Sequence, residues 1–346
     1  MKVVIRHANL QSDRQLIIDT ARRFLTPRSD DCRFSWLYES NAHGRARVWF
    51  AHSADDGEIV GMAGAFPRRI YIENREETAW VLGDFCINDR YRSLGPALAL
   101  QRACLVEVDA GAVAFCYDFP SKSMMAVYKR LQILPFAHIL RLAKPLRVDR
   151  RLKKLVKSQT FNRVLGVASN FVLKHTEKTF RGDGALDVSL HAGDYGGEFS
   201  DLARRIGGRY GVCAQRSAEY LNWRFVKNPL HQYELITARR GGALLGYAVF
   251  LHEGEDAMLV DLFGVDDEAV VNAVMAQCIA LMRTRGVQTV SAALIETHPW
   301  RLLLERHGFK VREVSPMVIY VPSNSASGAA IIREPKWLFM HGDRDS

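Results

Sequence analysis

The predicted fold depends most on one stretch of the sequence, Asp84-Phe85-Cys86-Ile87-Asn88-Asp89-Arg90-Tyr91-Arg92-Ser93-Leu94-Gly95-Pro96-Ala97. Its first four residues end an apolar stretch typical of a buried strand, and Pro96 begins a stretch typical of a helix. A helix N-terminus offers unpaired backbone N–H groups and a partial positive charge, which suit a pyrophosphate. Gly95 and Ala97 would let the backbone approach such a ligand closely, and Arg92 would add a charged donor. The alternative is an ordinary helix cap with an exposed arginine.

The composition is that of a globular protein with room for two domains. The chain has 346 residues, of which 48% are hydrophobic and 25% charged. No apolar run is long enough to span a bilayer, and charges interrupt the N-terminus too early for a signal peptide. Six scattered cysteines, without C-x-x-C spacing or histidines at ligand spacing, argue against a zinc site and favour a reducing cytoplasm. We therefore expect a cytoplasmic protein without a metal.

The net charge of +9 is concentrated in one segment. Residues 141–181 contain twelve Lys or Arg and two acidic residues, so the rest of the chain is close to neutral. Three interpretations are open: a solvated helix between two domains, an amphipathic helix on an anionic membrane, and a docking surface for an acidic ligand such as a nucleotide-linked sugar or RNA. Aromatic residues are few there, which argues against a stacking platform for nucleic acid.

The two halves of the chain repeat one pattern. Four stretches of the first half recur in the second half in the same order, displaced by 182 to 187 residues. They are Val4-Ile-Arg-His-Ala8 with Val188-Ser-Leu-His-Ala192, Asp19-Thr-Ala-Arg-Arg-Phe24 with Asp201-Leu-Ala-Arg-Arg-Ile206, Phe34-Ser-Trp36 with Leu221-Asn-Trp223, and Ile59-Val-Gly61 with Leu244-Leu-Gly246. The sequence therefore predicts a tandem duplication, with a repeat far too long for a solenoid. The histidines and tryptophans that recur are interpreted as structural.

Each half alternates strands and helices. In the first half, strands are expected around 45–51, 58–66, 78–87 and 112–119, and helices around 13–24, 96–108 and 121–131. The predicted fold class is mixed α/β, with two domains that each hold a twisted mixed sheet flanked by helices. The domains are expected at 1–145 and 185–346, joined by a basic helical linker over 146–184.

The junction resembles motif A of the GNAT superfamily of acyl-CoA-dependent N-acyltransferases. That motif reads V-x-x-x-x-[Q/R]-x-x-G-x-[G/A], and its fixed positions are occupied by Ile87, Arg92, Gly95 and Ala97. The next strand and helix resemble motif B, although Gln132 stands where many members have glycine. The resemblance covers residues 3–140 and, more faintly, 187–321.

The second half resembles a degenerate copy of the same domain. Residues 262–280 contain no R-x-x-G-x-[G/A] string, although Gly308 and Phe309 keep the Gly-Phe of motif B. The resemblance thus implies one catalytic domain, the first, followed by a non-catalytic one.

The family resemblance implies that a substrate amine attacks the thioester of an acyl-CoA, most often acetyl-CoA, directly. The acyl-CoA would be held by Phe85, Cys86, Ile87, Arg92, Ser93, Leu94, Gly95, Pro96 and Ala97. Asp84 stands where the family often has its base. Because Asp261 recurs at the matching place in the second half, a structural hydrogen bond is the alternative.

Three further residues are implied at the site. Tyr128 resembles the motif B tyrosine that protonates the departing thiolate, and Leu304 at the matching place in the second half favours this role over simple packing. Tyr117 and Asp118 end the preceding strand and would line the same cleft. They would contact the acceptor amine or cap the helix that starts near Ser121.

Three functions are therefore compared. The first is a transferase that acylates a small-molecule or sugar amine. The second is a non-catalytic acyl-CoA-binding or scaffolding protein, which would not depend on Asp84 or Tyr128. The third is an aminoacyl transferase that uses charged tRNA, against which the intact motif A argues. The acceptor, the acyl chain and the oligomeric state stay open.

Overall fold

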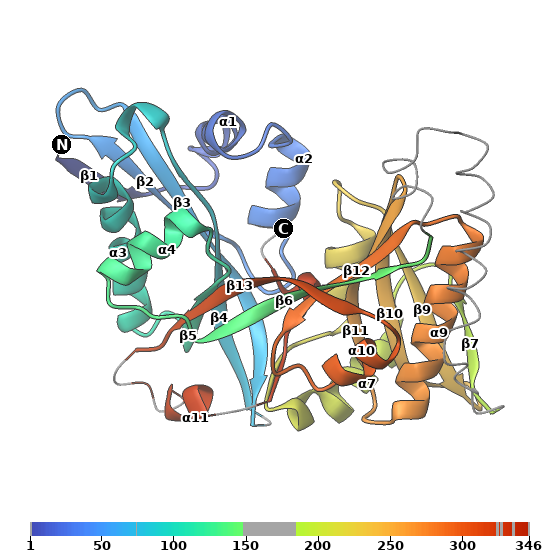
Figure 1. Cartoon of the computed structure of the whole chain (residues 1–346). Helices are drawn as coiled ribbons and strands as arrows, with labels where there is room; N and C mark the ends of the chain where they lie inside the picture. Colours follow the sequence, from blue (N-terminus) through green and yellow to red (C-terminus); the bar gives the residue numbers. More distant parts are fainter. Residues whose placement is uncertain are drawn as a thin grey trace.

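The computed structural model describes residues 2–73, 75–147, 185–322, 325, 328–333 and 336–344. Two lobes of strands and helices lie side by side, and two long strands cross between them (Figure 1). The first half of the chain forms β1 (Val3–His7), α1 (Arg14–Phe24), α2 (Asp31–Phe34), η1 (Ser35–Glu39), β2 (Arg47–Ser53), β3 (Ile59–Ile72), β4 (Arg75–Ile87), η2 (Asp89–Tyr91), α3 (Leu94–Asp109), β5 (Phe115–Asp118), α4 (Lys122–Arg130) and β6 (Ala137–Pro145).

The second half begins, within the described residues, at the strand β7. Its elements are β7 (Asp187–His191), α7 (Gly197–Ile206), η3 (Gly207–Tyr210), β8 (Val212–Ala214), α8 (Ala218–Leu221), η4 (Asn222–Val226), β9 (Tyr233–Arg240), β10 (Ala243–Glu253), β11 (Asp256–Gly264), α9 (Glu268–Thr284), β12 (Thr289–Ile295), α10 (Arg301–Arg306), β13 (Lys310–Tyr320), α11 (Gly328–Arg333), β14 (Trp337–Leu338) and η5 (His341–Asp343). Residues 148–184 lie outside the described residues, and they include nearly all of the basic linker expected over 146–184 and most of the basic segment 141–181.

The strands of the described residues form one connected mixed sheet. The order is β1-β2-β3-β4-β5-β13-β6-β12-β11-β10-β9-β7, while β8 pairs with β3 and β14. The parallel pairs are β4 with β5, β11 with β12, and β8 with β14. Helices flank the sheet, so the predicted mixed α/β class is confirmed.

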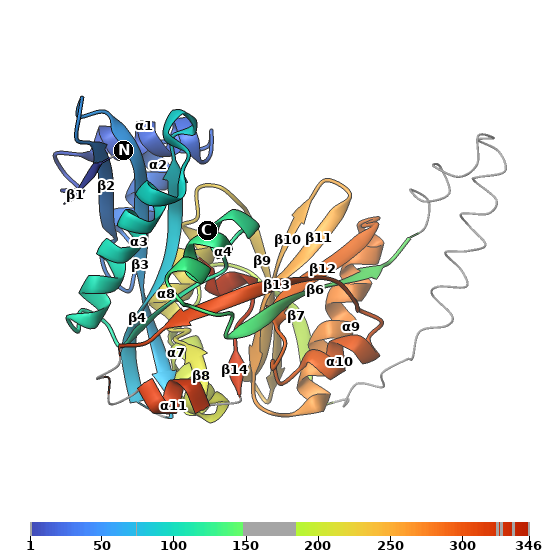
Figure 2. The ribbon, with the colours of Figure 1, turned by 60° about the vertical axis from the view of Figure 1, so that its left-hand side comes forward.

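Two strands connect the halves of the sheet. β6 belongs to the first half of the sequence, but it pairs with β12 and β13 of the second half. β13 pairs with β6 from Lys310 to Met317 and then continues to pair with β5 of the first half through Val318 to Tyr320. Both strands run across the middle of the molecule (Figure 2). A division at residue 145 therefore does not separate two sheets, because β6 lies among strands of the second half.

Matched positions of the two halves meet at the centre. η1 and η4 are both π-helices and carry the recurrent residues Trp36 and Trp223. Each indole N–H donates to the backbone carbonyl of the other tryptophan at 2.8 Å, and the rings stack with centroids 5.2 Å apart. Reciprocal contacts between equivalent groups are what a two-fold relation produces. Both buried tryptophans thus have a structural role in the contact between the halves, while the duplication stays a prediction.

A backbone feature also recurs. Gln132 adopts a φ of +60°, and Gly308, at the matching place after α10, adopts +89°. A left-handed conformation favours glycine, because a Cβ is strained there. Gln132 thus shares the left-handed conformation of Gly308, although it is not a glycine.

The buried residues form two clusters on opposite faces of the first-half strands. α3 and α4 cover one face, where Trp49, Trp80 and Tyr128 belong to the smaller cluster. The opposite face, with α1, α2 and η1, belongs to a larger cluster that continues through the second half. The first half is therefore packed directly onto the second. Its strands β4 and β5 lie between the smaller and the larger cluster, and contribute residues to both.

Candidate functional site

The strand–loop–helix junction forms where the sequence predicts it. β4 ends at Ile87, a short turn follows, and α3 begins at Leu94, two residues before the expected start. The side chain of Ser93 makes no capping hydrogen bond, and the first turn of α3 contains no acidic residue. The helix N-terminus therefore has backbone donors and a partial positive charge to offer a ligand, although Pro96 itself adds no N–H.

The side chains around this N-terminus leave its approach open. A Cβ on Gly95 would meet no heavy atom within 4 Å, whereas Ala97 is buried against the sheet. The side chain of Arg92 is 75% exposed and pairs with Asp89 at 2.8 Å. An ion pair this exposed contributes little stability, so a phosphate can replace Asp89 at small cost.

β4 and β5 separate at their carboxyl ends. They pair in parallel only as far as Val81 and Tyr117, whereas β4 continues to Ile87. A bulge marks the separation, because Asp84 and Phe85 lie opposite a single residue of β3. The predicted pantetheine-binding residues Phe85, Cys86 and Ile87 all follow the point of separation. The thiol of Cys86 is buried, and burial raises its pKa to about 12, so it stays protonated.

Asp84 is held at the bulge by a buried ion pair. Its φ is +44°, and its side chain is 3% exposed. The guanidinium of Arg33 donates to both carboxylate oxygens at 2.8 and 2.7 Å, and the hydroxyl of Tyr38 donates to one of them. Burial pushes the pKa of Arg33 down, but the adjacent Asp84 carboxylate outweighs burial and raises it. Because its oxygens are already engaged, the geometry favours the structural alternative over a role as base.

Tyr128 and Asp118 form a second polar pair. Ser121 itself caps α4 by accepting a hydrogen bond from the backbone N–H of Met124, whereas the sequence suggested Tyr117 or Asp118 for this cap. Tyr128 near the end of α4 is 1% exposed and donates to Oδ2 of Asp118 at 2.7 Å. Burial, followed by the carboxylate of Asp118, raises the pKa of Tyr128 well above its ordinary value. The phenol therefore keeps its proton at neutral pH.

Tyr117 does not share the cleft of Asp118, so this part of the sequence interpretation is wrong. Successive residues of a strand face opposite sides of the sheet. The hydroxyl of Tyr117 donates to the backbone carbonyl of Asp343 at 3.1 Å, within the core between the halves. Asp118, in contrast, meets Tyr128 of α4 on the other face.

The matching opening in the second half is filled by the chain itself. β11 and β12 pair in parallel only as far as Leu259 and Ala292 and then separate. The segment 337–344 contacts both strands beyond that point: Met340 bridges to Leu294, and a Cβ on Gly342 would lie 3.4 Å from the carbonyl of Val260. The second half therefore has no open counterpart of the β4–β5 separation in its described residues.

A buried charge cluster holds this segment in place. Arg216 lies 2.9 Å from Asp261 and 3.0 Å from Asp343, and all three side chains are at most 3% exposed. Asp261 thus has the same kind of partner as Asp84. A carboxylate inside an apolar strand requires a cation or hydrogen bonds. Asp84 and Asp261 therefore indicated in the sequence that each has a partner, but not which residue the partner is. For this reason Arg33, Arg216 and Asp343 were not among the predicted residues.

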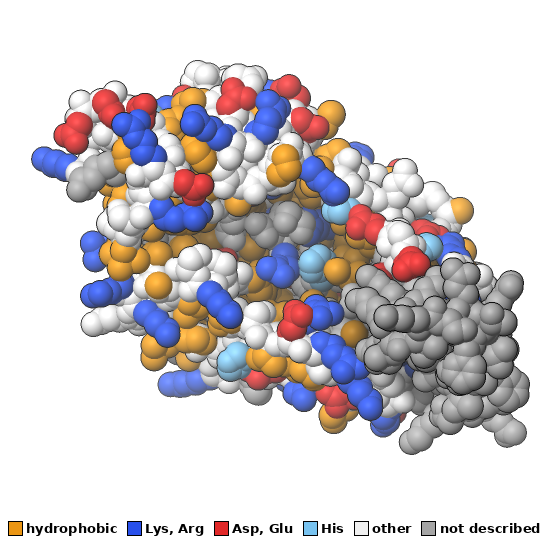
Figure 3. Space-filling model, turned by 45° about the horizontal axis from the view of Figure 1, so that its top comes forward, with side chains coloured by type: hydrophobic (Ala, Val, Ile, Leu, Met, Phe, Trp, Pro, Cys, Tyr) orange, Lys and Arg blue, Asp and Glu red, His pale blue; other side chains and the backbone are white. Residues whose placement is uncertain are grey.

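The surface is hollowed between the two halves. Lys, Arg and His side chains gather in the hollow, with hydrophobic side chains around them (Figure 3). In the described part of the chain, no group of three or more His, Cys, Asp or Glu is placed to hold a metal ion. No helix among these residues is long and apolar enough to cross a bilayer.

Similarity to known proteins is found at the level of structure. No family model matches the sequence, and no curated protein matches it. A probable N-acyltransferase from Enterococcus faecalis superposes with a TM-score of 0.67 at 11% identity, covering 93% of this chain and 72% of that one. A GCN5-related N-acetyltransferase from Anabaena variabilis gives 0.67 at 12% identity, with 92% and 73% covered.

A third similar structure is the N-myristoyltransferase of Saccharomyces cerevisiae with bound myristoyl-CoA. Its TM-score is 0.56 at 10% identity, and the match covers 93% of this chain and 80% of that one. Identities this low establish the fold alone. The chain therefore has the mixed α/β fold of the GCN5-related N-acetyltransferases over nearly its whole length.

Proposed function

We propose that this protein is an N-acyltransferase that moves an acyl group, most often acetyl, from CoA to an amine. The observation that carries the proposal is the contrast between the halves. In the first half, β4 and β5 separate beside the uncapped N-terminus of α3, whereas residues 337–344 fill the matching opening of the second half. This contrast supports one acyl-CoA site per chain, in the first half of the chain.

Each part of the site has a physical role in this proposal. The N–H groups at the start of α3 and the guanidinium of Arg92 bind the pyrophosphate, and Gly95 leaves room for it. The backbone from Phe85 to Ile87 binds the pantetheine arm. Acyl-CoA supplies the activated thioester when it is bound. Tyr128 holds a proton for the leaving thiolate, and Asp118 orients the phenol. The proton that the attacking amine loses passes to water, from which Tyr128 is protonated again.

We assign Asp84 a positioning role. Its carboxylate fixes the bulge of β4 through Arg33 and Tyr38, and the bulge orients the backbone that would hold the thioester. The acceptor is a small-molecule or sugar amine that enters through the hollow between the halves (Figure 3). The second half, as a degenerate copy, shapes the acceptor side.

The test measures both binding of acetyl-CoA and release of free thiol with a panel of amines. Arg92→Glu is expected to weaken acetyl-CoA binding by about tenfold or more, because a repulsive charge replaces an attractive one at the pyrophosphate. Arg102→Glu is the matched control, since Arg102 is exposed on α3 about two turns beyond the helix N-terminus. Failure to bind acetyl-CoA, or equal effects of the two substitutions, would refute the site.

Turnover separates the transferase from its non-catalytic alternative. Tyr128→Phe is expected to lower the rate of thiol release by about 10²-fold or more while leaving acetyl-CoA affinity within about threefold, because the phenol supplies a proton rather than binding energy. Tight binding of acetyl-CoA without turnover across the amine panel would instead establish a binding or scaffolding protein.

A further inference from the structure

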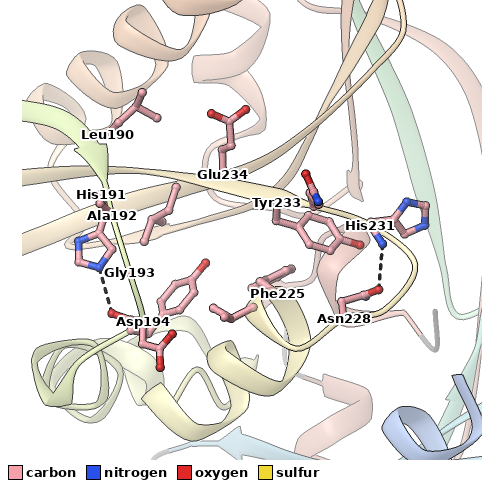
Figure 4. A pocket seen from close by; sticks show the side chains of 14 residues that line it. Leu190, His191, Ala192, Gly193, Asp194, Phe225, Asn228, His231, Tyr233 and Glu234 are labelled. Carbon is pink, nitrogen blue, oxygen red and sulfur yellow. Dashed lines mark hydrogen bonds between the residues drawn. The ribbon is translucent and has the colours of Figure 1, made fainter. Parts of the chain in front are cut away.

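A pocket of about 640 Å³ lies in the second half, away from the junction between β4 and α3. The end of β7 and the following turn form one wall, with His191, Gly193 and Asp194 (Figure 4). The end of η4, with Phe225, and the loop and strand from Asn228 to Leu235 form the others. Its volume falls in the range of pockets that bind small organic molecules, about 300–1,000 Å³.

Two asparagines hold the walls of the pocket in place. The side chain of Asn222 accepts from the backbone N–H of Tyr195 at 2.9 Å and donates to its carbonyl at 3.0 Å, which ties the turn after β7 to η4. Asn228 accepts from the N–H groups of Leu230 and His231 at 2.8 and 3.2 Å. The pocket is therefore formed before any ligand arrives, which lowers the entropic cost of binding.

Aromatic rings make up much of the lining. The ring centroids of Tyr195 and Phe225 are 6.4 Å apart, and those of Phe225 and Tyr233 are 5.1 Å apart. Two large apolar side chains, Leu190 and Val226, line the same pocket and are each 46% exposed. Exposed apolar side chains beside a preformed cavity mark a surface that a ligand can cover.

The charges of the lining select the ligand. Among the described residues, no Lys or Arg lines the pocket, although the chain carries a net charge of +9. Asp194 and Glu234 do line it, and Asp194 is exposed without an ion-pair partner in the described part of the chain, whereas Glu234 pairs with Arg285. Aromatic faces attract cations through their negative quadrupole. Two histidines also line the pocket, of which His231 pairs with Glu253, so an anion such as CoA would meet the carboxylates there without any Lys or Arg side chain among the described residues.

We infer that this pocket is a second ligand site, which binds an organic cation with an aromatic or aliphatic body. The body lies against Phe225, Tyr195 and Tyr233, and the charged group lies toward Asp194. This site differs in chemistry and in place from the proposed acyl-CoA site, so binding of the cation does not require that site to function.

Three matched probes test the inference by calorimetric titration of the full chain. They are 2-phenylethylamine, which is a cation at pH 7, the neutral 2-phenylethanol, and the anion 3-phenylpropanoate. The amine is expected to bind at least about tenfold more tightly than the alcohol, and the carboxylate more weakly than both, because the body is shared and the charge alone differs. Equal affinities within about twofold, or no binding of the amine up to about 10 mM, would overturn the inference.

Two substitutions of opposite charge at Val226 test whether the amine binds in this pocket. Val226→Lys is expected to weaken amine binding by about tenfold relative to Val226→Glu, since the two substitutions add similar bulk and opposite charge at the pocket. The same two substitutions at Val4, an exposed valine of β1 in the first half, are the controls and should change nothing. Equal losses in both Val226 variants would show a steric effect only and refute the selectivity for cations. Arg92→Glu should leave amine binding intact, which keeps this test independent of the proposed function.

Discussion

The buried pair between Arg33 and Asp84 allows a quantitative test of the role proposed for Asp84. Asp84→Asn removes the charge but keeps a residue that tolerates the φ of +44° and can still accept from Tyr38. Arg33→Met removes the cation. Both side chains are at most 4% exposed, so water cannot replace the lost partner. Each single change should therefore lower the free energy of unfolding by about 3–5 kcal/mol, because it leaves one buried charge without its partner.

The double variant Arg33→Met/Asp84→Asn shows whether the two side chains stabilise the protein as an ion pair or independently of each other. With both charges gone, no buried charge is left unpaired, so the combined loss should fall short of the sum of the single losses by about 2 kcal/mol or more. Urea denaturation of the four proteins at pH 7 gives this coupling energy. Losses that add within about 0.5 kcal/mol would refute the reasoning, because they would mean that the two side chains do not share an ion pair.

Activity of the same variants distinguishes positioning from base catalysis. If Asp84 only fixes the bulge, Arg33→Met and Asp84→Asn lower kcat/KM for acetyl-CoA by similar factors, and the shape of the pH profile is retained. If Asp84 is the base, Asp84→Asn alone removes the acidic limb of that profile. That second outcome would return Asp84 to the catalytic role first suggested by its place in the strand.

Three further predictions concern stability. Trp36→Phe and Trp223→Phe should each cost about 1–3 kcal/mol in urea denaturation, because each leaves one buried carbonyl without its donor; losses that differ more than twofold would contradict the reciprocal contact. Arg216→Met should destabilise by about 3–5 kcal/mol and speed proteolysis of the segment 337–344, whereas Asp343→Asn keeps the Arg216–Asp261 pair and should cost less; the reverse order would be inconsistent with the cluster. Burial raises the pKa of tyrosines such as Tyr128 in the folded state, so the stability they contribute is fully present below about pH 10 and is lost above it. Absorbance of phenolate at 295 nm should then rise together with unfolding, and ionisation of these tyrosines in the folded protein near pH 10 would contradict the prediction.

Local features of the fold were predictable from the sequence. The junction after Ile87 and the start of α4 near Ser121 each depend on a few neighbouring residues, and both form close to the expected places. The pairing of β6 with strands of the second half, and of β13 with β5 of the first half, was not predictable in this way. An apolar strand such as 137–145 has the same pattern whichever neighbour it pairs with, and its partner is chosen by packing between distant segments.

The candidate site likewise has residues that local sequence predicts and residues that depend on distant partners. Arg92, Gly95 and Ala97 lie at the helix start because strand, turn and helix signals are local. Whether Asp84 is engaged depends on Arg33, which is 51 residues away and lies in a four-residue helix with no periodic pattern. Tyr117 and Asp118 cannot line one cleft, because consecutive residues of a strand face opposite sides of the sheet.

The path of β13 has a consequence for how the chain is made. The end of β5 at Asp118 receives its neighbouring strand from Val318, about 200 residues later. At a synthesis rate of about 5–20 residues per second, the ribosome needs about 10–40 s to deliver that strand. During this interval β5 is an uncovered edge, and such an edge is open to pairing with other chains. Expression of the first half alone would therefore leave β5 without this neighbouring strand.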